Sequence, residues 1–195
     1  MNKKFYPPIA LLTLLLSAAC QPQDGTGTPA AASSVPAQAS AASASAAGNP
    51  AESGFKADAQ VLLKKLDEIG AKSSARLNTD DMNRKMGAYA KAARDKKGAL
   101  AKEISESELA VYREALGEIK AVKVDDKEVA GLRDLWARKF ETDIKLLEGR
   151  IAAIDKGVPE KDWLAATFDT KSADENEKLA AEASEKTLEF GRRAR

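Results

Sequence analysis

The feature that most constrains the fold is one long amphipathic segment, residues 126–156. Its apolar side chains recur at helical spacing and form one stripe: Val129, Leu132, Trp136, Phe140, Leu147, Ile151 and Ile154. Asp125 stands three residues before Glu128, which is capping-box spacing, and Gly157 with Pro159 ends the pattern. At 1.5 Å per residue such a helix is roughly 45 Å long, which favours an elongated bundle over a compact globule.

The rest of residues 52–195 has the same periodicity, and no segment alternates as a half-buried strand does. The expected helices are, in chain order, 54–77, 79–100 with a bend at Gly98, 105–119, 126–156, a short one over 159–167, and 173–192. Ser105 with Glu108, and Ser172 with Glu175, have capping spacing and mark two of these starts. The predicted fold class is therefore all-α, an elongated bundle of about five to six helices.

Each expected helix presents an apolar face to the core. Besides the long stripe, the residues predicted to point inward are Phe55, Ala59, Leu62, Leu66, Ile69, Ser73, Met82, Met86, Tyr89, Ala93, Leu100, Leu109, Tyr112, Leu116, Ile119, Leu179, Ala183, Leu188 and Phe190. Trp136 is predicted to be a core residue, and Trp163 either a core residue or a platform that stacks on sugar rings. The last helix has the thinnest apolar face, so it should be the least stable part.

The composition narrows the chemistry that this domain can carry. The chain has no histidine and one cysteine, so a histidine base, an ordinary zinc site and a disulfide are all excluded. No Gly-x-Ser-x-Gly turn or phosphate-binding glycine loop occurs. With 31 basic and 30 acidic residues, no overall charge steers the protein to nucleic acid. We expect no enzyme activity, no cofactor and no metal.

The N-terminus has the pattern of an export signal. Lys3 and Lys4 precede an apolar run over residues 9–16, and small residues follow at 17–19. The run is shorter than the roughly 20 residues that a membrane-spanning helix needs. Residues 1–19 are therefore predicted to be a signal peptide.

The lone cysteine, Cys20, closes the sequence "LSAAC" at residues 16–20. This motif resembles the lipobox of bacterial lipoproteins, although Ser17 stands where that motif most often has leucine. The resemblance covers only about the first 20 residues, and it implies cleavage before Cys20 and acylation of its thiol, with fatty acids such as palmitate. Two or three acyl chains give stable membrane attachment. An ordinary secretory signal with an incidental cysteine is the alternative interpretation.

The resemblance also bears on location. In Gram-negative lipoproteins the residue after the cysteine influences sorting, and Gln21 is not the aspartate that commonly retains such proteins in the inner membrane. The resemblance therefore implies a lipid anchor in the cell envelope, in the outer membrane, facing the periplasm or the cell surface.

Residues 21–51 are rich in Ala, Ser, Pro and Gly and almost lack large apolar side chains. Such a stretch cannot bury enough surface to offset its conformational entropy, so we expect a disordered tether. The predicted organisation is a signal peptide over 1–19, a lipidated Cys20 with its tether over 20–51, and a helical domain over 52–195. The tether is read as a spacer, with unselected filler as the alternative.

Several charged groups are candidate site residues. The carboxylate pairs Asp80 with Asp81, Glu106 with Glu108, and Asp125 with Asp126 fit catalytic or calcium-binding carboxylates, but all three lie at predicted helix starts, where capping explains them. The C-terminal arginines of Gly191–Arg195 fit a contact with anionic lipid or a polyanionic partner, or they are cations that complement a helix dipole.

Three further charges fall on apolar faces. With Trp136 at zero on a helical wheel, Asp143 lies at about −20° and Arg150 at about −40°, and Lys97 lies near the centre of its own helix face. Buried charges need partners. We therefore expect an internal polar network, a charged contact with a partner, or, if the long helix extends past its neighbours, ordinary solvated side chains.

Three functional classes remain. The favoured one is a protein-binding module of the envelope, of the accessory, inhibitor or immunity type, which is held at a membrane and engages an envelope protein through a helix face. A passive structural or spacer lipoprotein is the second. A carboxylate-dependent cell-wall enzyme is the third, and it requires a cleft that a bundle of alanine-rich helices does not indicate.

Overall fold

The computed structural model describes residues 50–167 and 170–195. The predicted signal peptide, Cys20 and nearly all of the predicted tether lie outside these residues. Residues Gly54–Arg195 form one compact unit. The described residues contain six α-helices, one short 3-10 turn and no strand, which confirms the all-α prediction.

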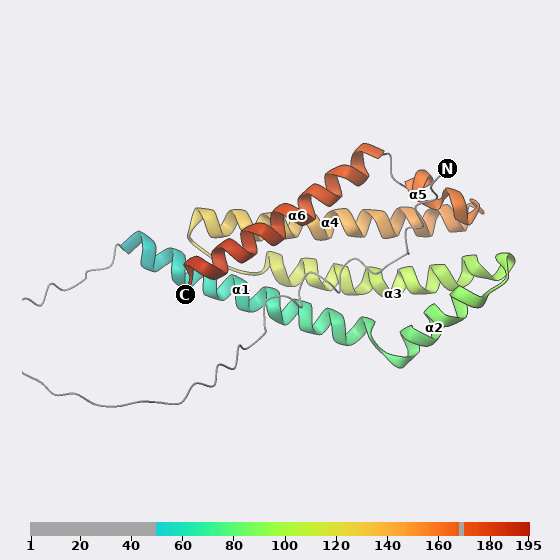
Figure 1. The fold of residues 1–195 in the computed structure, drawn as a ribbon, viewed down its shortest axis with the longest axis horizontal. Coiled ribbons are helices and arrows are strands. Elements are labelled where there is room, and N and C mark those ends of the chain that lie inside the picture. The colour runs from blue at the N-terminus through green and yellow to red at the C-terminus, as the bar shows by residue number, and fades with distance from the viewer. Residues whose placement is uncertain (1–49, 168–169) are drawn as a thin grey trace, which may run out of the picture. The chain divides into compact units, whose positions relative to one another are not determined.

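The helices are, in order, α1 (Pro50–Leu77), α2 (Asp80–Lys91), α3 (Arg94–Lys120), α4 (Lys127–Asp155), α5 (Trp163–Thr167) and α6 (Thr170–Arg193), with the 3-10 turn η1 (Glu160–Asp162) before α5. The most extensive packing joins α3 to α4, which lie antiparallel along the centre of the bundle (Figure 1). Helix α6 crosses α4 at an inclined angle, and α2 packs on α3 (Figure 1). Each central helix is roughly 40 Å long, so the bundle is elongated.

Local signals set the start of α2 and both ends of α4 close to where the sequence predicts them. The Asp126 carboxylate accepts hydrogen bonds from the amides of Glu128 and Val129 and so caps α4, one residue after the predicted cap. The Thr79 hydroxyl caps α2 by accepting from the Met82 amide at 3.2 Å. Gly157 has a φ of 71°, which lets the chain leave α4 through a left-handed residue.

The predicted boundary between the second and third helices is wrong. The break lies at Ala92 and Ala93, both extended, and α3 runs without interruption through Gly98 and Ser105. Ser105 is fully buried, and its hydroxyl donates to the Ala101 carbonyl at 2.8 Å instead of capping a helix. Burial of this turn in the core overrides its local capping pattern.

Two other helix starts differ from the prediction. Helix α6 begins at Thr170, so Ser172 lies inside it and does not cap it. Helix α1 begins four residues before the predicted start at residue 54, with Pro50 in the first turn, where a missing amide costs no hydrogen bond.

Most of the core is one set of buried residues, which we call the larger cluster. It joins α1, the end of α3, the first half of α4 and the second half of α6: Phe55, Ala59, Leu62, Leu66, Ile69, Ala115, Ile119, Val122, Val129, Leu132, Leu135, Trp136, Ala137, Phe140, Ala183, Phe190 and Ala194. The predicted inward face of α1 is confirmed from Phe55 to Ile69, as is the burial of Trp136.

A second, separate set of buried residues, the smaller cluster, lies at the other end of α3 and α4. It consists of Ala101, Ala153 and Trp163, with Tyr89, Ile154 and Val158 packed against it. Trp163 is buried and its indole N–H donates to the Val158 carbonyl at 2.7 Å, so it is a core residue and offers no sugar-stacking platform. Met86, Ala93 and Leu188, predicted to point inward, are instead exposed.

Candidate functional site

Cys20, the predicted lipidation site, lies outside the described residues, so acylation stays a prediction. Among residues 50–167 and 170–195, none of the helices combines the length and the apolar character that crossing a bilayer would require.

Buried and partly buried polar side chains lie between the two apolar clusters, in a stretch that also buries Ile104, Leu109 and Ile144. We call these polar side chains the polar layer, which consists of Glu108 and Tyr112 on α3, Lys139 and Asp143 on α4, and Asn176 on α6. Lys139 Nζ lies 2.5 Å from both carboxylate oxygens of Asp143, and the two residues are 6% and 8% exposed. Burial raises the pKa of Asp143, while Lys139 and a hydrogen bond from Asn176 act in the opposite direction.

Glu108 is the second buried carboxyl of the polar layer. It is 7% exposed, and the described residues form no hydrogen bond with its side chain. Burial raises the pKa of Glu108 to about 7, and the positive charge of Arg150 only partly opposes that shift. Tyr112 lies near both carboxyls; burial, Asp143 and Glu108 all raise its pKa.

Arg150 connects the polar layer to the smaller cluster. Its guanidinium lies 5.6 Å from the centre of the Trp163 ring, a cation–π arrangement. Beyond it, the Tyr89 hydroxyl donates to the Glu160 carboxylate at 2.6 Å. Burial and Glu160 raise the pKa of Tyr89 to about 12, while Arg150 acts to lower it.

Lys97 belongs to the same end of the bundle. Its ammonium lies 3.3 Å from a Glu160 oxygen and 5.1 Å from the centre of the Tyr89 ring. The structure therefore places Asp143, Arg150 and Lys97 in three different local settings. Asp143 pairs with Lys139, Arg150 lies over Trp163, and Lys97 pairs with Glu160.

The capping interpretation of the predicted carboxylate pairs is confirmed for some of the residues and wrong for others. Asp80 and Asp81 lie in the first turn of α2, and Asp126 caps α4, as the capping interpretation predicts. For Glu106 and Glu108 that interpretation is wrong, because both lie in the middle of α3 and Glu108 is buried. The cause is the misplaced helix start at Ser105.

A groove of about 440 Å³ lies between α3 and α4. Its floor is apolar and contains two small side chains: Leu109, Ala110, Ile151 and Ala152. One ion pair between the two helices stands at each end of the groove. Arg113 lies 2.7 Å from Glu148, and Lys102 lies 2.6 Å from Asp155.

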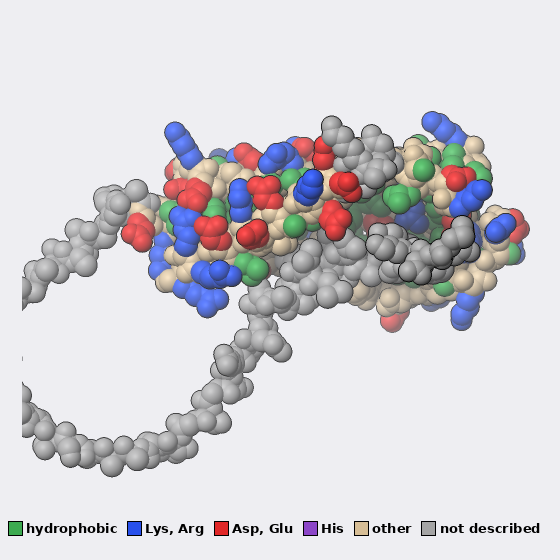
Figure 2. Space-filling model, turned by 45° about the horizontal axis from the view of Figure 1, so that its top comes forward, with side chains coloured by type: hydrophobic (Ala, Val, Ile, Leu, Met, Phe, Trp, Pro, Cys, Tyr) green, Lys and Arg blue, Asp and Glu red, His purple; other side chains and the backbone are tan. Residues whose placement is uncertain are grey.

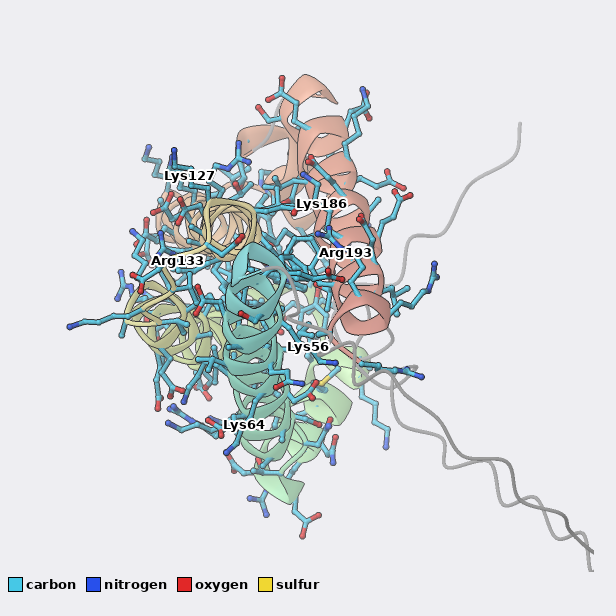
Figure 3. All side chains as sticks on the ribbon, turned by 90° about the vertical axis from the view of Figure 1, so that its left-hand side faces the viewer. Lys56, Lys64, Lys127, Arg133, Lys186 and Arg193 are labelled. Atoms are coloured by element: carbon cyan, nitrogen blue, oxygen red, sulfur yellow. The ribbon has the colours of Figure 1, made fainter. Side chains whose placement is uncertain are left out.

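Of the C-terminal arginines, Arg193 is engaged within the domain. Arg193 pairs with Glu128 at 2.6 Å and lies 3.9 Å from the centre of the Phe55 ring, which ties the end of α6 to α4 and α1. Figure 3 shows labelled basic residues of α1, α4 and α6 spread around this end of the bundle. Arg193 therefore serves packing and pairing within the domain.

The sequence analysis did not predict the buried positions of Lys139 and Glu108, and it did not name Asn176. Lys139 stands four residues before Asp143 on the same stripe, an i,i+4 spacing of opposite charges that would have identified the pair. Glu108 stands four residues after the buried Ile104, so helical periodicity alone would have placed it inside.

Within the described part of the chain, no group of three or more His, Cys, Asp and Glu side chains is arranged to hold a metal ion. No protein-family model matches the sequence, and the comparisons with curated proteins and with solved structures found no match either.

Proposed function

We propose that this protein is an envelope lipoprotein whose helical domain binds another envelope protein and catalyses no reaction. Acyl chains on Cys20 hold it at the outer membrane, residues 21–49 act as the tether, and the groove between α3 and α4 receives a helix of the partner.

The support for the anchor is the sequence around Cys20. A basic start, a short apolar run and small residues precede the single cysteine of the chain. A free thiol in an exported protein is open to oxidation, whereas an acylated one is not. The polar, alanine-rich residues that follow suit a tether.

The observation that carries the binding proposal is the groove. Small side chains at Ala110 and Ala152 allow a third helix to approach α3 and α4 closely, and the apolar floor provides surface to bury. The lining charges are two ion pairs and one further carboxylate, Glu106, so apolar contact and shape would dominate recognition. Figure 2 shows acidic and basic side chains interspersed on the visible face, which fits a partner that is not a polyanion.

One observation favours the second candidate, a passive spacer. The large apolar residues that are exposed, Val61, Met86, Leu164 and Leu188, lie on four different helices, so they form no obvious binding patch. The groove is then an ordinary surface furrow between two helices.

Photo-crosslinking in cells separates these two candidates. A crosslinking residue at Ala110 in the groove should form a defined adduct with one envelope protein, and the same residue at the exposed Ala181 on α6 should not. Ala152→Trp, which fills the groove, should abolish the Ala110 adduct. Equal labelling from both positions, or an adduct that survives Ala152→Trp, contradicts the groove proposal and favours the spacer.

The anchor needs its own experiment. Wild-type protein should incorporate labelled palmitate and partition with membranes, and Cys20→Ala should do neither. Soluble, unlabelled wild-type protein would show that the anchor proposal is wrong.

A further inference from the structure

The outer face of α3 and α4 carries ion pairs that all have the same polarity. Arg113 lies 2.7 Å from Glu148, and Lys120 lies 2.6 Å from Glu141. In both pairs α3 supplies the cation and α4 the anion, and the four side chains are between 40% and 59% exposed. The pairs are seven residues apart on each helix, so they lie on one face of the bundle. This face therefore has a basic edge on α3 and an acidic edge on α4.

The other charges on this face fit the two edges less completely. Lys102 with Asp155 repeats the polarity at the far end of the groove. Glu106 on α3 and Lys145 on α4 are exposed and have the sign opposite to their own edges. Glu106 acts to raise the pKa of Lys102, so these two charges partly offset each other. The polarity is therefore clearest along Arg113–Glu148 and Lys120–Glu141.

The surface between these charges is small and open. Among the described residues, the lining of the groove comes from α3 and α4 alone. Ala110 lies in the groove, and the exposed Gly117 follows it two turns later on α3. A Cβ atom added at Gly117 would meet no side chain and no other helix within 4 Å. A second helix can therefore approach α3 closely along this line.

We propose that the partner whose helix enters the groove is a second copy of this chain, so that α3 of each copy lies against α4 of the other. This inference rests on the proposed function and names its partner. A half-turn about an axis parallel to the helices places the basic edge of one copy on the acidic edge of the other. Arg113 and Glu148 of both copies then meet as two cations and two anions, and Lys120 and Glu141 do the same.

The direction of the axis follows from charge and from where the chain enters the bundle. The Asp58 carboxylate accepts hydrogen bonds from the amides of Asp125 and Asp126, both at 2.7 Å, so the start of α1 lies beside the connection between α3 and α4. An axis parallel to the helices keeps this end of both copies on the same side, as two anchors in one membrane require. An axis across the helices would put it on opposite sides and face α4 with α4, acidic edge against acidic edge.

Anchoring also reduces the contact area that such a dimer needs. Stable complexes of free proteins bury about 800 Å² per partner. Two copies held at one membrane meet at a high effective concentration, so a smaller contact between two helix pairs is sufficient.

The test is photo-crosslinking in cells that express two copies of the full chain, one of them with an epitope tag. A crosslinking residue at Ala110 of the tagged copy should give an adduct with the untagged copy, at twice the mass of the chain. Arg113→Glu in both copies brings four carboxylates together and should lower the yield of this adduct at least about tenfold, as should Glu148→Arg in both, which brings four cations together.

Co-expression of the two charge variants is the decisive arm. With Arg113→Glu in one copy and Glu148→Arg in the other, two anions again meet two cations, and the adduct should return. Arg84→Glu reverses an exposed, paired cation on α2 and should leave the yield unchanged. Gly117→Leu places a side chain where the single chain has open space, so the variant should keep its helical circular dichroism and lose the adduct.

Two results overturn the second copy as partner: an Ala110 adduct with a different protein, which leaves the groove proposal standing, or a copy-to-copy adduct that does not follow the charge pairing. Absence of any Ala110 adduct contradicts the proposed function as well. Should a charge variant fail to fold, Gly117→Leu still decides, because an adduct between copies that survives it contradicts the close approach of α3.

Discussion

The two ends of the helical domain are built on different principles. The larger cluster closes four helices around large apolar side chains, among them Leu62, Ile119 and Leu132, which are almost completely inaccessible. The smaller cluster buries two alanines and one tryptophan, and polar contacts such as Tyr89 with Glu160 and Arg150 over Trp163 surround it. Apolar burial stabilises one end, and the other relies on paired polar groups.

Because of this difference, the two ends should contribute unequally to the stability of the domain. Burial of large apolar side chains contributes about 1.5–3 kcal/mol per residue, whereas exposed ion pairs contribute about 0–1 kcal/mol. The larger cluster should therefore set the global stability. The smaller cluster should open first, as regions with few buried apolar contacts do. The groove between α3 and α4 lies toward this less stable end, between Lys102–Asp155 and Arg113–Glu148.

The largest effect should come from the polar layer that separates the clusters. Lys139→Met leaves Asp143 buried without its cation and should lower the free energy of unfolding by about 3–5 kcal/mol. Urea denaturation measures this. The double variant Lys139→Met with Asp143→Leu removes the stranded charge and should recover most of the loss. A double variant as unstable as the single one would mean that the pair is not the source of the cost.

Truncation of the larger cluster should come next. Leu132 is 1% exposed, and Leu132→Ala should cost about 2–5 kcal/mol because the rigid surroundings keep most of the cavity open. Leu164→Ala on the exposed surface of α5 is the matched control, with an expected change below about 0.5 kcal/mol. If Leu132→Ala and Leu164→Ala lowered the free energy of unfolding by similar amounts, the larger cluster would not dominate the stability of the domain.

The pH dependence of stability provides a third measurement. The pKa of Glu108 is raised from 4.5 to about 7 on folding, so its favourable contribution is complete below pH 4.5 and is lost as the pH rises through 7. Wild type should lose about 3 kcal/mol over this window relative to Glu108→Gln. Asp143, whose pKa is also raised, contributes in the same direction. Superimposable pH profiles for wild type and Glu108→Gln contradict this assignment.

The smallest effect compares two helix caps. Asp126 caps α4 in the larger cluster and Thr79 caps α2 beside the smaller one, and each substitution by alanine should cost about 1 kcal/mol. Asp126→Ala should lower the global free energy of unfolding. Thr79→Ala should leave the global value nearly unchanged and increase hydrogen exchange in α2 alone. Global destabilisation by Thr79→Ala would show that the two ends unfold together.

The same contrast explains which parts of the fold can be predicted from sequence. Helices α1 and α4 have long apolar stripes and α4 has a carboxylate cap, so local pattern and tertiary burial agree. At Ser105 the local pattern and tertiary burial disagree. The sequence there has capping spacing, but the residue lies in a turn of α3 that is buried in the core. Leu188 was placed inside because α6 offers few apolar residues, yet its side chain is 51% exposed.

The polar layer could be predicted only in part. Helical geometry places Asp143 on the buried stripe, and the structure buries it. The sequence analysis named Arg150 and Lys97 beside Asp143 and did not consider Lys139, the partner that stands four residues earlier on the same helix. Glu108 was assigned to a helix start that does not exist, and with it the proton-sensitive position of the layer was missed.

The two tryptophans of the chain allow the most direct test of the two-part account, since Trp136 lies in the larger cluster and Trp163 in the smaller one. Trp163→Phe leaves fluorescence from the larger cluster alone, and Trp136→Phe leaves fluorescence from the smaller cluster alone. Each substitution removes one indole hydrogen bond, to Val158 and Thr187 respectively, so the pair is matched. In urea at pH 8 the account predicts that the Trp163 signal changes at a clearly lower concentration than the Trp136 signal. Coincident transitions would contradict it.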